Sequence, residues 1–356
     1  MSMLKLALSL VIVLLLASST QAAVVLEYHH VSNSTPKSTS ISPERFNQQM
    51  DYLQNHHFKV VPLTELAELL RAGKLLPDKT VAITFDDSYA SVYQAAYPLL
   101  KQRGWPFTFF VNTDAVGSSP LFVSWPQLRE MAKNGVTIAN HSQYHRHMPR
   151  RSKDETLAQW RERTSQEIQA AEKMIEREIG SSAKIFAYPF GEYDIELQAV
   201  LKKLDYIAFG QQSGPLGSQL DLQSVPRFPF GGSFTELDDF IMKVNSLPMP
   251  VTGVKFFSDK KSAMNNLLVK QGDKPYLQLQ VSDKSLLGKI HCFATGQGAI
   301  AAEVIDGSLW VQARQPLPQG RTRYNCTAAS AEKGRFYWYT QQWLATNKQG
   351  EWTYSD

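Results

Sequence analysis

The sequence predicts an α/β protein with a parallel sheet, open or closed into a barrel, followed by a smaller all-β domain. From Val24 to about Met242, apolar runs of strand length alternate with amphipathic segments of helix length. Repeated β–α alternation of this kind is typical of a parallel sheet. After about Val254 the pattern changes to short alternating runs such as YLQLQV, LWVQAR and FYWYTQQWL, without a convincing long helix. These runs predict a small β-sandwich.

The expected strands of the first domain are short apolar runs rich in β-branched and aromatic residues. They are the segments 23–31, 58–63, 80–85, 106–112, 136–141, 184–190, 206–210 and 224–228. In folds built from parallel strands, functional side chains gather where the strands end and the loops begin. The residues that follow each run are therefore the first candidates for a site.

The helices expected between these strands have apolar faces or recognisable ends. One begins at Ser42, where Pro43 occupies the first helical position, and an apolar stripe follows it. The longest covers 155–180, has one apolar stripe and is closed by Gly180. The others are expected at 64–73, 93–104 and 124–135.

Composition and charge limit the class of protein. The chain has 356 residues, of which 43% are hydrophobic and 20% charged, so it has room for one large domain or two. The net charge of +4 is too small for this length to indicate a nucleic-acid partner. Because no basic run exceeds a few residues, we expect no nucleic-acid binding.

The first 22 residues have the pattern of a secretory signal peptide. Lys5 is followed by an apolar core from Leu6 to Ala17 and then by small and polar residues, with cleavage expected after Ala22. An uncleaved membrane anchor is the alternative, but the apolar run is shorter than a full span. We therefore expect a secreted or periplasmic protein with no stable membrane span after cleavage.

The two cysteines, Cys292 and Cys326, lie in the C-terminal third of the chain. An exported protein meets oxidising conditions, which favours a single disulfide. Neither cysteine has a second cysteine at CxxC spacing, so a cysteine metal site is not expected. Tyr324 precedes Cys326 by two residues, as in the tyrosine corner of immunoglobulin-like domains. The sandwich is therefore expected to be immunoglobulin-like, with Cys292 on the partner strand.

Acidic and imidazole side chains follow two of the expected strands. Asp86 and Asp87 end the strand 80–85, and adjacent buried carboxylates need a compensating charge. His141 is the last residue of the expected strand 136–141 and His145 comes four residues later, a spacing at which two imidazoles can share a metal ion. Two histidines and one aspartate with an open position are typical of a hydrolytic metal centre. The other aspartate can then act as general base on a metal-activated water.

The segments TFDDS, HSQYH and FAYPFGEY, in this order, resemble the first three motifs of the polysaccharide deacetylases, the carbohydrate esterase family that shares the NodB homology domain. The segment LEYHHV is similar to the start of the poly-N-acetylglucosamine deacetylase branch, in which the barrel is circularly permuted. The resemblance covers Val24 to about Phe240. It implies a distorted (β/α) barrel, a divalent metal that is usually zinc, and removal of N- or O-acetyl groups from sugars.

The resemblance also implies roles for individual residues. By motif position, Asp86 corresponds to the general base, and Asp87, His141 and His145 to the metal ligands. The residues expected to line the site are Tyr188, Phe190 and Gly191, with a backbone N–H near Phe190 polarising the acetyl oxygen.

The chain departs from the motifs of the family in two places. Ser88 stands where the first motif usually has glycine, so we expect a loop that needs no glycine conformation. Ala187 stands where the third motif usually has the arginine that orients the base. Arg227, at the end of a later expected strand, is the best substitute, and an ordinary surface arginine is the alternative interpretation.

A third departure concerns the general acid, because no Leu-x-His occurs late in the catalytic region. The permuted branch places the acid histidine at the start of the chain, where Tyr is followed directly by His. This pattern favours His29 as the acid, with His30 turned outward or into packing. His147 is the alternative acid. Structural interpretations are preferred for His56, His57 and His291.

Together these observations predict a secreted, metal-dependent deacetylase acting on an acetylated polysaccharide or oligosaccharide that contains N-acetylglucosamine. Residues 1–22 would be the signal peptide, 23–248 the catalytic domain and 249–356 the β-sandwich. An O-acetyl esterase acting on xylan or peptidoglycan and a non-catalytic glycan-binding protein on the same fold are the alternatives. Four tryptophans in the C-terminal domain either bind glycan by stacking or pack its core. A monomer is expected.

Overall fold

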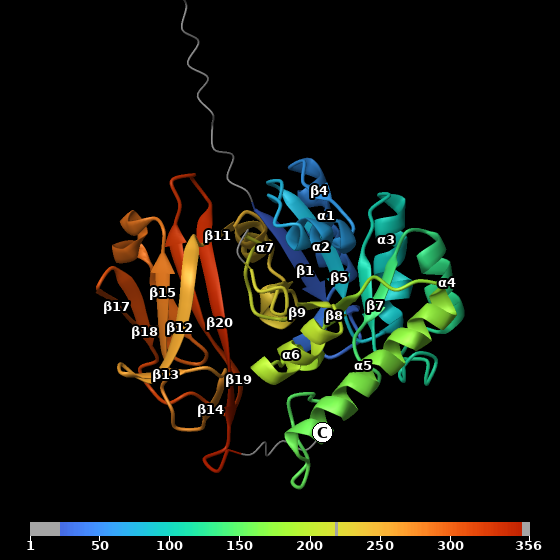
Figure 1. The fold of residues 1–356 in the computed structure, drawn as a ribbon. Coiled ribbons are helices and arrows are strands. Elements are labelled where there is room, and N and C mark those ends of the chain that lie inside the picture. The colour runs from blue at the N-terminus through green and yellow to red at the C-terminus, as the bar shows by residue number, and fades with distance from the viewer. Residues whose placement is uncertain (1–21, 218–219, 351–356) are drawn as a thin grey trace, which may run out of the picture.

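The computed structural model describes residues 22–217 and 220–350, so the predicted signal peptide lies outside the described residues. Figure 1 shows an α/β domain, drawn from blue to yellow, beside an all-β domain drawn in orange and red. Within the described residues, no helix combines the length and the apolar character needed to cross a bilayer.

The α/β domain is built on one parallel sheet. Its strand order is β10-β1-β5-β6-β7-β8-β9, with β4 paired to β5 at the side of this path, and every pairing is parallel. The strands are β1 (Ala23–Tyr28), β4 (Lys59–Val60), β5 (Thr80–Phe85), β6 (Thr108–Val111), β7 (Thr137–Asn140), β8 (Ile185–Ala187), β9 (Ile207–Phe209) and β10 (Phe228–Pro229). A separate short pair joins β2 (His30–Val31) to β3 (Ser40–Ile41). The predicted parallel α/β sheet is confirmed.

Helices lie between the strands at most of the expected places. They are α1 (Pro43–Asn55), α2 (Leu63–Arg71), α3 (Tyr97–Gln102), α4 (Trp125–Lys133), α5 (Leu157–Ile179), α6 (Ile195–Lys203) and α7 (Leu237–Val244). The helix expected at 93–104 is present as a π-helical turn, Val92–Ala96, that continues directly into α3. Helices α6 and α7 were not expected. A signal for α6 was present in the sequence, because Asp194 is its N-cap and accepts a hydrogen bond from the Leu197 N–H at 2.9 Å.

The strand expected at 224–228 is much shorter in the structure. Only Phe228 and the following proline form β10, while Val225 makes an isolated bridge to Phe209. Pro226 lies between these two pairings, and a proline cannot donate a ladder hydrogen bond. The segment is therefore anchored to β9 at Val225 and to β1 at Phe228, which places Arg227 between strands from opposite ends of the sheet.

The sheet has apolar clusters on both faces, as expected for a buried parallel sheet. Along β1, Leu26 and Tyr28 belong to one buried cluster, whereas Ala23 and Val25 belong to the other. Side chains of a strand alternate between the two faces. Glu27 therefore lies on the face of Ala23 and Val25, and its side chain is completely buried.

The C-terminal domain is all-β, as predicted. Its strands follow the order β11-β20-β19-β16-β17-β18-β15-β12-β13, with β14 paired to β20. They are β11 (Leu247–Pro248), β12 (Val251–Asp259), β13 (Ser262–Met264), β14 (Leu268–Lys270), β15 (Tyr276–Val281), β16 (His291–Ala294), β17 (Gly298–Ile305), β18 (Ser308–Gln312), β19 (Gly320–Ala329) and β20 (Phe336–Thr346). Trp343 is buried in the core of this domain, so core packing accounts for that tryptophan.

An immunoglobulin-like topology is not confirmed. The structure contains the expected disulfide between Cys292 and Cys326, but these residues face each other on the adjacent strands β16 and β19. In antibody domains the corresponding bond joins two sheets. The Tyr324 hydroxyl donates to the Pro275 carbonyl at 2.9 Å, 49 residues upstream, rather than to a carbonyl a few residues away as in a tyrosine corner.

The two domains share a tightly bonded interface. The Trp338 ring of β20 contacts the Phe228 ring of β10 edge-on, with 5.3 Å between the ring centroids. Arg335 donates to both carboxylate oxygens of Asp78 at 2.7 and 2.9 Å. The all-β domain is therefore packed directly against the sheet domain.

Candidate active site

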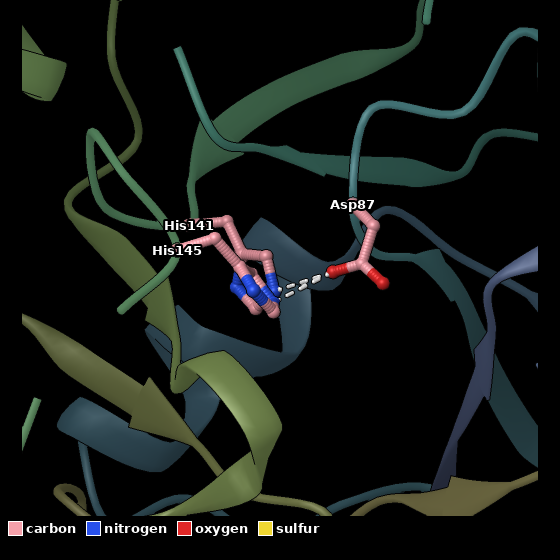
Figure 2. Close-up of side chains that lie close together, drawn as sticks. All are labelled: Asp87, His141 and His145. Atoms are coloured by element: carbon pink, nitrogen blue, oxygen red, sulfur yellow. Dashed lines mark hydrogen bonds and ion pairs between the residues drawn. The ribbon is translucent and has the colours of Figure 1, made fainter. Parts of the chain in front are cut away.

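The polar residues predicted to form a site come from the carboxyl ends of several strands. His29 follows β1, Asp86 and Asp87 follow β5, His141 follows β7, and the segment 188–191 follows β8. Parallel strands end at the same edge of a sheet, so residues distant in sequence meet there. Figure 2 shows the side chains of His141 and His145 pointing together toward Asp87.

Asp87, His141 and His145 form a compact cluster in which the potential ligand atoms all lie within 4.8 Å of one another. The Nε2 atoms of His141 and His145 lie 3.1 and 2.9 Å from Asp87 Oδ1. His141 Nδ1 lies 2.8 Å from the Ala187 carbonyl oxygen, which can only accept, so this nitrogen carries the proton. In neutral His141, the Nε2 lone pair then faces a carboxylate oxygen.

Two acceptor atoms 3.1 Å apart repel each other unless a positive charge lies between them. A divalent cation would relieve this repulsion, and two imidazoles with one carboxylate are ligands that suit zinc. A backbone carbonyl that fixes the tautomer of a ligating histidine is also a usual feature of metal sites. The donor set of this cluster therefore fits a divalent cation.

The loop that carries Asp87 has a strained backbone. Asp87 and Ser88 have φ values of 74° and 61°, in the left-handed region that favours glycine. The expectation that Ser88 avoids a glycine conformation is therefore wrong. Asn112 holds the loop in this conformation, because the Ser88 hydroxyl donates to its side-chain oxygen at 2.7 Å and accepts from its N–H at 3.0 Å. Such strain persists only where surrounding contacts fix it.

Asp86 is completely buried and is paired with Arg227, which is also completely buried. The Nη1 and Nη2 atoms of Arg227 donate to the two carboxylate oxygens at 2.8 and 2.7 Å, and its Nε donates to the Gly210 carbonyl at 2.9 Å. Burial acts to raise the pKa of Asp86, but the charge and hydrogen bonds of Arg227 outweigh it and keep this pKa below its ordinary value. The structure thus brings Arg227 to Asp86 and excludes the interpretation of a surface arginine.

Replacing Arg227 by methionine should strongly destabilise the protein, because the Asp86 carboxylate would remain buried without its partner. We expect the free energy of unfolding to fall by about 3–5 kcal/mol, the usual cost of breaking a buried ion pair. Urea denaturation measures this change. The Arg45→Met variant is the control, because Arg45 pairs with the exposed Glu236 and should lose about 1 kcal/mol or less. An equal effect in the two variants would contradict the prediction.

The adjacent histidines His29 and His30 have different surroundings. His29 Nε2 lies 3.8 Å from Asp87 Oδ2 and 3.8 Å from Glu27 Oε1. One side-chain nitrogen or oxygen atom from each of Glu27, His29 and Asp86 lies within 4.8 Å of the other two. A substrate atom undergoing reaction could therefore contact His29 and Asp86 at the same time. His30 instead stacks on Tyr89 at 3.6 Å, and burial lowers its pKa to about 4.

His147 stays outside the cluster of three ligands. Its Nδ1 lies 2.8 Å from Glu192 Oε2, and its ring stacks on Phe190 at 3.8 Å with an interplanar angle of 7°. Phe190 is 38% exposed and has a positive φ of 57°. The Tyr188 side chain, by contrast, is fully buried and donates to the Gln223 carbonyl at 2.7 Å. Of the residues expected to line the site, Phe190 therefore presents a side chain to solvent, and Tyr188 does not.

Sequence reasoning missed Glu27 as a residue of this region. Both of its carboxylate oxygens are buried without a hydrogen-bond partner among the described residues, and Oε2 lies 3.6 Å from Arg227 Nε. Burial raises the pKa of Glu27. A signal was present, because a charged residue inside the apolar run AVVLEY is unusual for a buried strand.

Comparison with known families agrees with this geometry. Residues 73–209 match the family model described as "Polysaccharide deacetylase". The resemblance inferred from the sequence motifs is thereby confirmed.

Two curated relatives carry the name poly-beta-1,6-N-acetyl-D-glucosamine N-deacetylase. The protein from Escherichia coli (strain K12) is 25% identical over 240 residues, which are 57% of this chain and 36% of that protein. The protein from Staphylococcus aureus (strain MRSA252) is 28% identical over 181 residues, 49% of this chain and 62% of that protein. The chain thus spans about a third of the first relative and about three fifths of the second.

Solved structures show the same fold. IcaB from Ammonifex degensii superimposes with a TM-score of 0.54 at 26% identity, covering 60% of this chain and 94% of that chain. The deacetylase PplD from Streptococcus pyogenes has a TM-score of 0.54 at 22% identity, covering 60% of this chain and 95% of that chain. The α/β domain thus has the NodB-type deacetylase fold, with its parallel sheet curled into a half-barrel.

Proposed function

We propose that this chain is a metal-dependent polysaccharide deacetylase that removes acetyl groups from glycans containing N-acetylglucosamine. The observation that carries the proposal is the Asp87–His141–His145 cluster beside the buried Asp86–Arg227 pair, at the carboxyl edge of the sheet. The names of the relatives from Escherichia coli and Staphylococcus aureus support a β-1,6-linked glycan and an amide rather than an ester bond.

We assign Asp87, His141 and His145 as the ligands of a divalent cation, with zinc favoured by the two imidazole nitrogens. When bound, such a cation supplies Lewis-acid polarisation of an acetyl carbonyl and lowers the pKa of a coordinated water. His141 is prepared for this role by its bond to the Ala187 carbonyl, which fixes the tautomer.

The remaining residues supply proton transfer and positioning. Asp86 accepts the proton of the attacking water, and Arg227 holds its carboxylate in one orientation. A backbone N–H near Phe190 donates to the developing oxyanion. His29 gives a proton to the departing nitrogen, so that a C–O bond forms, the C–N bond breaks, and acetate and an amino sugar are released.

Acetate release tests this proposal directly. Purified protein is incubated with oligomers of β-1,6-linked N-acetylglucosamine and, in parallel, with O-acetylated xylan. We expect acetate from the first substrate, loss of release after treatment with a chelator, and recovery on addition of zinc. Faster release from xylan would assign an O-acetyl esterase instead. No release from either substrate, with no metal in the purified protein, would indicate a non-catalytic glycan-binding protein.

Several parts of the proposal concern the whole chain. The leader pattern of residues 1–22 and the disulfide of Cys292 and Cys326 support export to the periplasm or the cell exterior. We further propose a catalytic domain over 23–248 and a C-terminal domain over 249–356 that contributes to glycan binding. A monomeric state also stays a prediction.

A further inference from the structure

A small polar cavity of about 130 Å³ lies between the two domains. One of its lining residues, Gln212, follows β9 of the sheet domain, and the others belong to or follow β16, β19 and β20 of the all-β domain. The lining residues are Gln212, Thr295, Arg321, Thr322, Arg323 and Gln342. In Figure 1, β19 and β20 lie on the side of the all-β domain that faces α6 and β9. None of the proposed catalytic residues or metal ligands lines this cavity.

Polar atoms of the cavity wall are buried without partners. Gln342 is 1% exposed, and it pairs with Arg323 across β19 and β20, so the two side chains share one face of the sheet. Both side-chain polar atoms of Gln342 have no hydrogen-bond partner in the described residues. Buried polar groups are nearly always hydrogen-bonded, and an ion or water explains most exceptions. Unpartnered polar atoms in the wall of this cavity can therefore form hydrogen bonds with a bound polar molecule or ion.

Two guanidinium groups add positive charge to the same wall. Arg321 donates one hydrogen bond, to the side-chain oxygen of Gln211 at 2.9 Å. Among the described residues, the Arg323 side chain has no hydrogen bond, and no carboxylate lies within ion-pair distance of either guanidinium. Glu27 attracts both arginines at longer range and Glu192 attracts Arg321, but Glu27 also lies 3.6 Å from Arg227 and Glu192 lies 2.8 Å from His147. Both arginines are partly shielded from solvent and have no ion-pair partner among the described residues, so positive charge is in excess here.

We propose that this interdomain cavity binds one small oxyanion, such as phosphate, sulfate or a carboxylate. Guanidinium forks match the geometry of such anions, and the Gln342 amide can donate to a remaining oxygen. A cavity of about 150 Å³ holds a benzene molecule, so the space suits an oxyanion and is too small for a sugar ring. Water would satisfy the amide but would leave the two guanidinium charges uncompensated.

Thermal unfolding of the full chain tests this proposal independently of any deacetylase activity. Metal-free protein is titrated with phosphate, sulfate, acetate and chloride at matched ionic strength. We expect at least one oxyanion at 10 mM to raise the unfolding midpoint by about 2–4 °C, while chloride does not. The same shift in Asp87→Ala protein would exclude binding at the candidate metal site. Comparing phosphate and sulfate with acetate distinguishes a tetrahedral from a planar anion.

Variants locate the site. Arg323→Gln should weaken oxyanion binding at least about tenfold, whereas Arg314→Gln, which removes an exposed arginine of the same domain, should not change it. If Arg323→Gln fails to fold, Gln342→Leu provides the comparison, because it removes the amide from the same face of the sheet with little change in volume. Equal midpoint shifts in Gln342→Leu or Arg323→Gln and the parent chain would overturn the proposal. So would the absence of a shift with any oxyanion, or a crystal structure grown in phosphate that shows only water in the cavity.

Discussion

Replacing Asp87 by alanine is expected to abolish metal binding and acetate release together. Asp87 Oδ1 is the atom on which both imidazoles converge, at 2.9 and 3.1 Å, so its loss removes the only carboxylate of the three-residue ligand set. His141→Ala should have the same double effect. Metal content measured by mass spectrometry and acetate release measured on the same sample are expected to fall in parallel, with release reduced at least about 10³-fold.

The neighbouring variant Asp86→Asn should separate the two properties. An asparagine keeps the shape of the side chain and an acceptor for Arg227, but it cannot take up a proton at neutral pH. Metal content should therefore stay near that of the parent chain, while turnover falls by about 10²–10⁴-fold, the usual contribution of a positioned base. If Asp86→Asn also emptied the site, the roles of the two aspartates would have to be exchanged.

The second large effect is expected for His29. An amide nitrogen departs only when it is protonated. His29 Nε2 lies 3.8 Å from Asp87 Oδ2, and a ring nitrogen of His29 lies within 4.8 Å of a carboxylate oxygen of Asp86. His29→Ala should lower turnover on an N-acetylated oligomer by about 10²–10⁴-fold while metal content persists. His30→Ala should have a much smaller effect, because His30 packs against Tyr89 away from the cluster.

A substrate with a better leaving group distinguishes an acid from a merely structural residue. Nitrophenyl acetate releases nitrophenolate, which departs without a proton. His29→Ala should therefore retain most of its rate on this ester, whereas Asp86→Asn should lose rate on both substrates. Near-normal amide hydrolysis in His29→Ala, together with collapse in His147→Ala, would assign the acid role to the pair of His147 and Glu192 instead.

Much of the fold was predictable because its signals are local. Apolar runs of strand length, and their alternation with helical segments, can be recognised within short segments of the sequence. A parallel sheet then brings the ends of the strands to one edge. Arg227 was also foreseen, since it follows an apolar run near the end of the sheet domain. Its burial and its two bonds to Asp86 were not visible, because they join residues 141 positions apart.

The wrong expectations share a non-local cause. The left-handed conformation of Ser88 is held by Asn112, 24 residues further along the chain, so the identity of residue 88 alone could not reveal it. The environment of Glu27 likewise depends on Arg227 of its own domain and on Arg321 of the all-β domain. In both cases tertiary contacts override what the residue type favours locally.

The contact between Arg335 and Asp78 has a consequence for how the molecule is assembled. These residues are 257 positions apart, and β11 and β20 are likewise brought together from distant parts of the chain. Domains generally fold as units before they dock, and docking takes milliseconds to minutes. Arg321 reaches Gln211 across the same interface, and it lies against the loop of Gly191. We therefore expect the surroundings of the candidate site to be completed only when the two domains dock, so that formation of the site depends on correct folding of both.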